Sequence, residues 1–358
     1  MNPKLIINLF KLRTNLDRLV DCCHAVGIKT AIVTKVFCAD ERICRMISES
    51  EADAFADSRV QNLAAIAELH SDKPTQLLRI SMQSEVEDVV RYADISMQSE
   101  KETIRLIGSA AKKLGKVHKI ILMVDMGDLR EGIFNTDEAQ IFSAAEAILA
   151  EPALEFHGIG VNLTCYGGII PDETNLGGLL AIADKLRKRY CVPLPIVSGG
   201  NSSMLTMLEE NRIPEGITQL RLGESFVLGN NTESGKPVEW LNTDCFTLEA
   251  ELVEVQRKPS KPIGTSGLNA FGERVTFEDR GEMIRGILAI GRQDVNPDGL
   301  TPLDPDVEII GASSDHLIVN LTNCKKYKVG DTLRFIPDYG ALLKLTTSKY
   351  VHREYAEQ

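Results

Sequence analysis

Residues 118–127 read HKIILMVDMG, with five consecutive apolar side chains, and LEFHGIGVNL follows at 154–163. Such runs are typical of strands in a parallel sheet, which is covered on both faces. Six further runs have the same character and alternate with segments of helical spacing: KTAIVTKV (29–36), DAFADS (53–58), QLLRIS (76–81), ADISMQS (93–99), PLPIVSGG (193–200) and TQLRLGE (218–224). Eight alternating strands and helices predict an α/β protein with a closed (β/α)8 TIM-type barrel.

The pattern changes after about Thr243, where short apolar runs are separated by Gly, Pro and Asp turns. These runs are CFTLEAELVEV, IRGILAI, VEIIG, HLIVNL and DTLRFI, and they predict a C-terminal β-rich domain. The junction NNTESGKPVEW (230–240) has the composition of a linker. We therefore expect a barrel over residues 1–235 and a β domain over residues 236–358. Packing of the first strand, about residues 4–9, with the C-terminal domain is left open as an alternative.

Composition narrows the class of protein. The chain has 358 residues, enough for a barrel and a smaller domain. Its net charge of -11 argues against non-specific binding to nucleic acid or to an anionic membrane. No run of 18 apolar residues and no leader-like N-terminus occur, so a cytoplasmic location is expected. Eight cysteines without C-x-x-C pairing and six scattered histidines indicate reduced thiols and no metal site.

Lys35 follows the apolar residues of AIVTKV at the C-terminal end of the first barrel strand. Barrels hold their active sites at this face. The apolar neighbours predict a largely buried amine, and burial favours the neutral form that attacks an aldehyde to form a Schiff base. A strand-end lysine that reaches solvent is the plain alternative. Lys35 therefore needs support from other residues at the same face.

Two loops at this face favour a bound phosphate. The seventh strand ends in SGGNSS, and a helix with free backbone N–H groups is expected to follow. The eighth strand ends in RLGE, where barrels commonly bind phosphate. A capped turn is the alternative for either loop, but the coincidence of the two favours a phosphate cofactor. The residues expected to hold it are Ser198, Gly200, Asn201, Ser202, Arg221, Gly223 and Glu224.

Two further strands end in polar residues. The fifth is followed by VDMGDLREGI, in which glycines flank Arg130 and permit close approach of the backbone to a ligand. Arg130 could bind a phenolate or a carboxylate there, or it could be a solvated loop arginine. The sixth strand ends in VNLTCYGG, which brings Asn162, Cys165 and Tyr166 to the same face. Simple packing of these three polar residues is the alternative.

Together these elements resemble the alanine-racemase family of fold-type III pyridoxal-phosphate enzymes over nearly the whole chain. The segments VNLTCYGG, SGGNSS, IGRQDV and GASSDHLIV are most similar to the ornithine racemase branch of that family. The resemblance implies pyridoxal 5'-phosphate as the cofactor and an amino acid as the substrate. It also implies a head-to-tail homodimer, because SSDHLIV is similar to a family strand, M-D-x-L-x-V, that reaches the partner subunit's site.

The resemblance assigns roles residue by residue. Lys35 is similar to the family's cofactor lysine, and Arg221 to the arginine that contacts the pyridine nitrogen. Ser202 resembles the phosphate-binding serine, and Arg130 the arginine at the phenolic oxygen. Asn162 stands where alanine racemases carry a histidine against the ring. Tyr350, near the C-terminus, is a further expected cofactor contact.

Two departures from the family pattern concern the opposite face of the substrate. Phe271 in NAFG stands where the alanine enzymes carry an essential tyrosine in V-S-Y-G, and Arg292 in GRQD replaces a second tyrosine. Phenylalanine cannot transfer a proton, so another residue must do so. The candidates are Cys165, Tyr166, Asp315 and His316. The expected catalytic residues are Lys35, Arg130, Asp315 and His316, and the expected substrate-binding residues are Arg292, Asp294, Ser314 and Asp315.

The predicted activity is racemisation of an amino acid by abstraction and return of the Cα proton. Ornithine is the first choice of substrate and lysine or arginine the next, since Glu224, Asp294 and Asp315 are carboxylates that could bind a distal ammonium. Decarboxylation or aldol chemistry on the same fold remains an alternative. So does a non-catalytic pyridoxal-phosphate carrier, although such proteins lack the C-terminal β domain.

Overall fold

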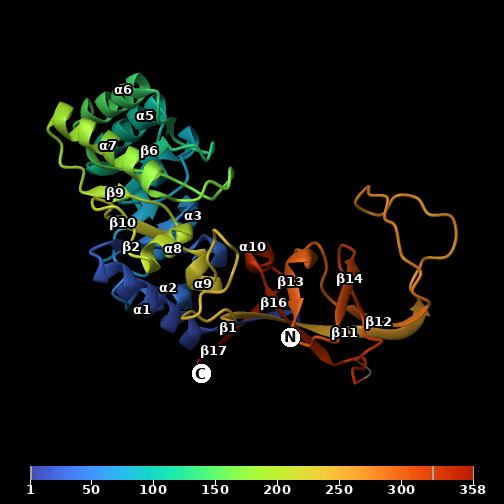
Figure 1. The fold of residues 1–358 in the computed structure, drawn as a ribbon. Helices are drawn as coiled ribbons and strands as arrows, with labels where there is room; N and C mark the ends of the chain where they lie inside the picture. Colours follow the sequence, from blue (N-terminus) through green and yellow to red (C-terminus); the bar gives the residue numbers. More distant parts are fainter. Residues whose placement is uncertain (1, 325, 358) are drawn as a thin grey trace. The chain divides into compact units, whose positions relative to one another are not determined.

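The computed structural model describes residues 2–324 and 326–357. These residues form two compact units, one over Leu12–Thr243 and the other combining the chain up to Lys11 with the chain from Asp244 onward. Each unit has a sheet of its own (Figure 1). Among the described helices, none has both the length and the apolar character needed to cross a membrane.

The first unit is a closed parallel barrel. Its strand order is β5-β4-β3-β2-β10-β9-β8-β6, and pairing of β5 with β6 closes the ring. The eight strands are β2 (Lys29–Val33), β3 (Ala54–Asp57), β4 (Thr75–Leu77), β5 (Ile95–Gln98), β6 (His118–Asp125), β8 (Leu154–Gly160), β9 (Ile196–Ser198) and β10 (Gln219–Leu222). A short strand, β7 (Ile133–Phe134), is added parallel to β6. The predicted barrel is confirmed: seven of the predicted apolar runs contain one of its strands, and QLLRIS (76–81) overlaps β4, which begins one residue earlier.

Helices separate these strands along the chain (Figure 1). They are α1 (Leu9–Ala25), α2 (Glu41–Ser48), α3 (Val60–Ala67), α4 (Val86–Tyr92), α5 (Lys101–Leu114), α6 (Glu138–Leu149), α7 (Glu173–Tyr190), α8 (Leu205–Glu209) and α9 (Glu224–Leu228). Helix α5 shows why they form: Ile104, Ile107 and Ala111 recur at helical spacing and are buried. It ends at Gly115, whose φ of 66° closes the last turn in the left-handed conformation.

A buried apolar cluster joins three strands of the barrel. Ile95, Met97, Ile121, Met123 and Ile196 form one buried apolar cluster, drawn from strands β5, β6 and β9. Such layers of bulky residues fill barrels of this size, so the barrel is a packed core and not a pore. Function is therefore expected at the ends of its strands.

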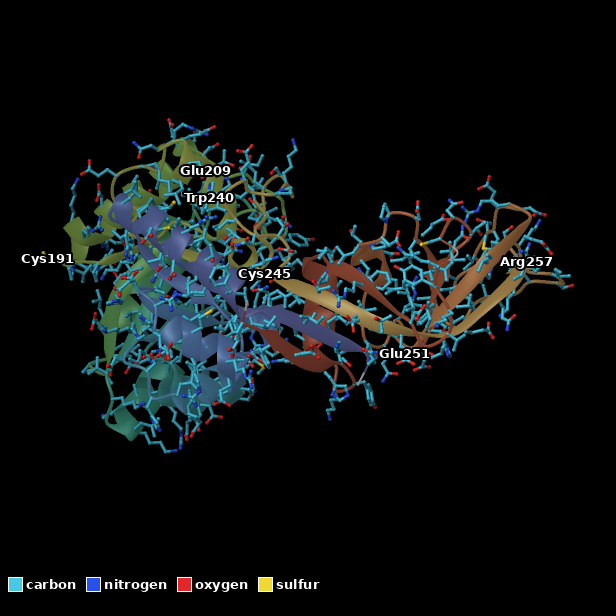
Figure 2. All side chains as sticks on the ribbon, turned by 90° about the horizontal axis from the view of Figure 1, so that it is seen from below. Cys191, Glu209, Trp240, Cys245, Glu251 and Arg257 are labelled. Carbon is cyan, nitrogen blue, oxygen red and sulfur yellow. The ribbon has the colours of Figure 1, made fainter. Side chains whose placement is uncertain are left out.

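The segment with linker composition packs on the barrel unit. The Asn15 side chain of α1 donates to the Asn242 carbonyl oxygen at 2.9 Å. Trp240 Nε1 donates to Glu209 Oε1 at 2.7 Å, and both residues are labelled in Figure 2. These bonds tie residues 240–242 to α1 and to the end of α8, so the chain leaves the barrel unit only after Thr243.

The second unit is a largely antiparallel sheet. Its order is β13-β16-β11-β12-β15-β14, and β1 pairs with β11 and β17. The strands are β1 (Lys4–Asn8), β11 (Phe246–Pro259), β12 (Glu282–Leu288), β13 (Leu300–Pro302), β14 (Glu308–Ala312), β15 (Leu317–Asn320), β16 (Thr332–Pro337) and β17 (His352–Ala356). One helix, α10 (Tyr339–Thr347), precedes β17. The C-terminal β-rich domain is confirmed, and the first strand of the chain belongs to its sheet.

Candidate active site

The carboxyl ends of the barrel strands bring most of the predicted residues of this unit to one face. Strand β10 pairs with β2 in the register Arg221↔Ala31, so the strand that carries Arg221 lies beside the strand that leads to Lys35. On its other side β10 pairs with β9, which ends at Ser198. Asn162 and Arg130 follow β8 and β6, which are themselves neighbours.

Arg221 lies at the centre of a buried hydrogen-bond network. Its side chain is almost fully buried, with 2% of the residue exposed. Nη2 donates to Asn162 Oδ1 at 2.6 Å and to the Val161 carbonyl oxygen at 2.7 Å, and Nη1 donates to Ser198 Oγ. Burial lowers the pKa of Arg221 to about 10, which leaves the guanidinium charged at neutral pH. The network therefore holds a fixed cation at the barrel mouth.

Ser198 lies behind Arg221 in this network. It is fully buried, and its hydroxyl donates to Gln219 Oε1 at 3.0 Å while it accepts from Arg221. Both contacts are to protein side chains. The geometry is that of a residue that orients Arg221.

Arg130 is bound by a carboxylate that the sequence analysis did not single out. Arg130 Nη2 donates to Glu131 Oε1 at 2.6 Å, and Arg130 Nε donates to Glu131 Oε2. Burial opposes the charged form of Arg130, but the hydrogen bonds to Glu131 and the nearby negative charges, including those of Glu131 and Asp128, together outweigh it and raise the pKa of the guanidinium. Glu131 also accepts from Asn162 Nδ2, so it joins Arg130 to the Arg221 network.

A second carboxylate that the sequence analysis missed, Asp128, shapes the loop after β8. The Asp128 side chain is buried and accepts from the backbone N–H groups of Cys165 at 3.2 Å, Tyr166 at 2.9 Å and Ile169 at 3.2 Å. The side chains of Cys165 and Tyr166 are exposed, and 77% of Tyr166 is accessible. Asp128 thus fixes the backbone of this loop and leaves Tyr166 at the surface.

The two predicted phosphate loops lie against each other. Ser202 Oγ accepts from the Gly223 N–H at 3.2 Å, the Ser225 N–H at 3.1 Å and the Ser225 hydroxyl at 2.9 Å. The Asn201 side chain accepts from the Ser203 N–H at 2.9 Å. The Gly223 and Ser225 N–H groups therefore already have a partner in Ser202.

The donor set at these loops fits a phosphate group. Ser203 Oγ is buried and has no hydrogen-bond partner among the described residues, so a hydroxyl is available there. The Ser202 hydroxyl belongs to the preceding residue, and the hydroxyl of Ser225, which directly follows RLGE, donates to the Ser202 hydroxyl. Gly200, with a φ of 140°, provides the turn that no residue with a Cβ adopts easily. Hydroxyl donors beside such a glycine turn suit an anion such as phosphate.

Lys35 opens a short 3-10 turn, Lys35–Phe37, directly after β2. The structure corrects its expected burial: the residue is only partly buried, because the strand ends at Val33 and the chain turns before Lys35. Thr34 Oγ1 donates to Asp57 Oδ2 at 2.5 Å, and Asp57 is fully buried. Burial raises the pKa of Asp57. This bond fixes the backbone immediately before Lys35.

The turn that carries Lys35 also lies beside the phosphate loops. Phe37 packs edge-on against Phe226 of α9, with 6.1 Å between the ring centroids. Gly223 lies against the end of β2, since a Cβ at this glycine would be 3.1 Å from Val33 Cβ. The structure therefore brings the Lys35 turn, the RLGE loop and the SGGNSS loop together.

The remaining predicted residues, apart from Glu224, belong to the second unit. Arg292 lies over the ring of Phe271 at 5.3 Å, and its N–H donates to the Ser313 carbonyl oxygen at 2.8 Å. Ser314 Oγ donates to Asp315 Oδ2 at 2.6 Å, and Ser314, Asp315 and His316 are all exposed. Arg292 and Phe271, the two departures from the family pattern, are thus direct neighbours.

Three other predicted residues have partners within their own unit. Asp294 is buried and accepts from Ser348 Oγ at 2.6 Å. Tyr350 is 63% exposed, and its N–H donates to the same Ser348 hydroxyl at 3.1 Å. Glu224, in the barrel unit, accepts from Thr232 Oγ1 at 3.2 Å.

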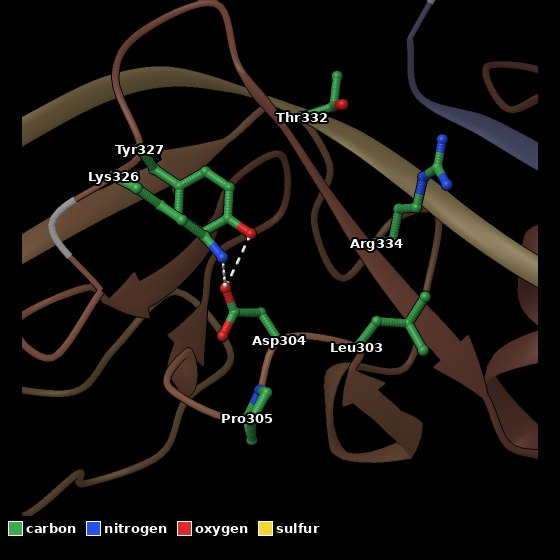
Figure 3. Close-up of a pocket in the computed structure, with 7 residues that line it drawn as sticks. All are labelled: Leu303, Asp304, Pro305, Lys326, Tyr327, Thr332 and Arg334. Carbon is green, nitrogen blue, oxygen red and sulfur yellow. Dashed lines mark hydrogen bonds and ion pairs between the residues drawn. The ribbon is translucent and has the colours of Figure 1, made fainter.

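A pocket of about 490 Å³ in the second unit involves none of the predicted residues (Figure 3). Asp304 Oδ2 accepts from Lys326 Nζ at 2.8 Å and from the Tyr327 hydroxyl at 3.0 Å. These partners hold the pKa of Asp304 well below its usual range, with the Lys326 contact as the largest cause. The carboxylate therefore ties the turn after β13 to residues 326–327.

Comparison with known proteins agrees with this arrangement. The family described as alanine racemase, N-terminal domain, matches residues 7–230. The chain is 48% identical to ornithine racemase of Acetoanaerobium sticklandii over 355 residues, which cover 99% of both chains. It is 38% identical to lysine racemase of Thermotoga maritima over 353 residues, 99% of this chain and 98% of the relative.

Solved structures show the same fold. Alanine racemase from Bartonella henselae, crystallised with covalently bound pyridoxal phosphate, matches with a TM-score of 0.75 and 16% identity. The match covers 99% of this chain and 100% of that chain. The expected fold and the expected class of enzyme, an amino-acid racemase, are confirmed. Full-length similarity at up to 48% identity, together with the match of the family over residues 7–230, shows that this chain belongs to the alanine racemase family.

Proposed function

We propose that this protein is a pyridoxal 5'-phosphate-dependent racemase that interconverts L- and D-ornithine or a closely related diamino acid. The observation that carries the proposal is the buried Arg221 network, which holds a cation on the strand beside the one that leads to Lys35. The relatives at 48% and 38% identity are named for ornithine and lysine, which are both diamino acids, and they support the choice of substrate.

The residues that would hold the cofactor are those that meet at the barrel mouth. Ser202, Ser203 and Ser225 would hold the phosphate, with Gly200 allowing its close approach. Lys35 would supply the amine. When bound, pyridoxal phosphate supplies an aldehyde for this amine and draws electrons from the substrate's Cα.

Arg221 tunes this site through its charge. A pKa of about 10 is three units above neutral pH, so removing its proton there would cost about 4 kcal/mol. A guanidinium at the ring nitrogen would therefore donate a hydrogen bond without giving up its proton. With the cofactor bound, this charge would limit the flow of electrons into the ring and so favour return of a proton to Cα over transamination.

Protons move at the two faces of Cα. Lys35 Nζ would take the proton from one face and return it there in the reverse direction. For the other face we propose His316 from the second copy of a head-to-tail homodimer, because its segment SSDHLIV is similar to the family strand that reaches the partner subunit's site. Phe271, at the position of the family tyrosine, cannot serve.

We extend the proposal to a head-to-tail homodimer. The connection between β11 and β12 carries a set of exposed apolar side chains: Ile263, Leu268, Phe271, Val275 and Phe277. Exposed apolar groups clustered on one loop are typical of surfaces that contact another protein. A second copy of this chain is the partner that the family resemblance implies. The cytoplasmic location stays a prediction.

A distal ammonium requires a carboxylate near the substrate. Of the three predicted candidates, Asp294 is buried and Glu224 is half-buried, whereas Asp315, which accepts from Ser314 Oγ, is exposed. We therefore favour Asp315 for substrate recognition. A charge-assisted hydrogen bond is worth about 1.5 to 3 kcal/mol, which alanine could not gain.

Initial rates of racemisation of ornithine, lysine, alanine and serine, measured with added cofactor, test the proposal. We expect kcat/KM for ornithine or lysine to exceed that for alanine by about tenfold or more, which corresponds to about 1.4 kcal/mol. A preference for alanine would refute the diamino-acid substrate but keep the racemase. Absence of racemisation with all four would refute the activity.

A further inference from the structure

Glu131 lies between the two arginines of the barrel mouth. We infer that Glu131 is a positioning residue whose carboxylate aligns Arg130 and fixes the orientation of the Asn162 amide that holds Arg221. The inference rests on the proposed function only in taking Arg130 and Arg221 as the cations that face the cofactor. The contacts themselves stand on the geometry of the barrel unit.

Both oxygens of the Glu131 carboxylate are used. Oε1 accepts from Arg130 Nη2 at 2.6 Å and from Asn162 Nδ2, and Oε2 accepts from Arg130 Nε. The side chain is 19% exposed, so water competes little for these bonds. A carboxylate that bonds two nitrogens of one guanidinium fixes the plane and direction of that group, not only its distance.

The chain of bonds also has a defined polarity. An arginine can only donate, and an ionised carboxylate can only accept. The Asn162 amide has an accepting oxygen and a donating nitrogen. Its Oδ1 accepts from Arg221, and its Nδ2 donates to Glu131. Rotating this amide by half a turn would set donor against donor at Arg221 and acceptor against acceptor at Glu131. The carboxylate thus secures an acceptor for Arg221.

Charge makes Glu131 hard to replace by its neighbours. Within the described residues, Glu131 is the carboxylate that forms an ion pair with Arg130. Asp128, three residues earlier, already accepts backbone N–H groups of the loop after β8. Removing the charge of Glu131 would therefore remove the carboxylate that bonds Arg130 directly and Arg221 through Asn162.

The substitution Glu131→Gln tests this role, because glutamine keeps the size but removes the charge and adds a donor. We expect the dissociation constant for pyridoxal phosphate to rise about tenfold. We also expect the pH at which the visible absorption of the bound cofactor changes to shift by at least half a unit. Glu131→Asp should recover part of both effects, since it restores the charge.

The matched control is Glu138→Gln on α6, whose carboxylate is half exposed and pairs with Lys185 at the surface at 2.5 Å. It should leave cofactor affinity and absorption unchanged. Thermal unfolding of each apoprotein shows whether a substitution destabilises the fold or only misaligns the arginines. We expect the Tm of Glu131→Gln to lie within about 3 °C of that of the parent.

A double substitution tests whether Glu131 acts through Asn162. If it does, Glu131→Gln should worsen cofactor affinity less when it is added to Asn162→Ala than in the parent, because one of its two actions is already lost and only the alignment of Arg130 remains to be removed. Independent effects that multiply would overturn the inference, as would a Glu131→Gln variant with the affinity and absorption of the parent. Failure of the parent protein itself to bind the cofactor would instead refute the proposed function, and with it the role of Glu131 toward that cofactor.

Discussion

Replacement of Arg221 by methionine gives the clearest measure of the buried network. The guanidinium supplies hydrogen bonds to the Val161 carbonyl oxygen, Asn162 Oδ1 and Ser198 Oγ. Each buried acceptor that loses its donor costs about 1 kcal/mol, which sums to about 3 kcal/mol. Methionine also removes the cost of burying a cation, which offsets part of this loss. We expect a net loss of about 2 kcal/mol in the free energy of unfolding.

Thermal unfolding of the apoprotein provides the assay. For a unit of this size, about 2 kcal/mol corresponds to a fall in Tm of roughly 4 to 8 °C. The control is Arg105→Met on α5, since Arg105 is exposed and its ion pair with Glu102 spans 3.6 Å. Surface pairs of this kind contribute less than about 1 kcal/mol. A Tm for Arg221→Met equal to that of the control would refute the account of Arg221 as the centre of the network.

Three further predictions concern the cofactor and pH. In the parent protein, borohydride should trap a covalent linkage to pyridoxal phosphate that is detected by intact mass, and Lys35→Ala should abolish it. A trapped adduct in the variant would exclude Lys35 as the cofactor lysine. Ser202→Asp should raise the dissociation constant for pyridoxal phosphate at least about tenfold, or about 1.4 kcal/mol, because it sets like charge beside the phosphate; an unchanged value would exclude this loop. His118 is buried, and its Nε2 lies 2.8 Å from Ser96 Oγ. Burial lowers the pKa of His118 to about 4 in the folded protein, whereas an unfolded histidine has a pKa of about 6.5. Between about pH 6.5 and pH 4 the imidazole is therefore protonated in the unfolded chain but not in the folded one. Stability should fall by about 3 kcal/mol as pH drops through that range, and denaturant unfolding of His118→Gln should show a correspondingly smaller fall.

The fold could be read from the sequence to a large extent because buried parallel strands leave a continuous apolar signal. Runs such as HKIILMVDMG contain β6, and TQLRLGE contains β10. Five strands of the second unit, β11, β12, β14, β15 and β16, also overlap predicted runs, whereas β13 and β17 lie outside them. Helix α10 was missed because it lies between strands and shows no long amphipathic pattern.

The candidate site could be predicted only in part. Lys35, Arg130, Asn162, Ser202 and Arg221 stand at strand ends or in loops with recognisable composition, and their expected roles stay predictions. Glu131 was missed because it follows an arginine in a polar loop, where a carboxylate is ordinarily a solvated charge.

Asp128 and Asp57 escaped notice for a related reason. Each acts on the backbone or on a hydroxyl of another segment, as Asp57 does on Thr34, and such contacts depend on which strands are neighbours. The burial of Lys35 was overestimated because a strand end cannot be located to within two residues from apolar pattern alone.

The most direct test of the proposed function is incubation of the protein and pyridoxal phosphate with L-ornithine in deuterium oxide. The product is then resolved by chiral chromatography with mass detection. Abstraction and return of the Cα proton predict D-ornithine that carries one deuterium at Cα, with no loss of carbon dioxide. Recovery of L-ornithine without deuterium, or a decarboxylated amine as the product, would contradict the assignment of this protein as an ornithine racemase.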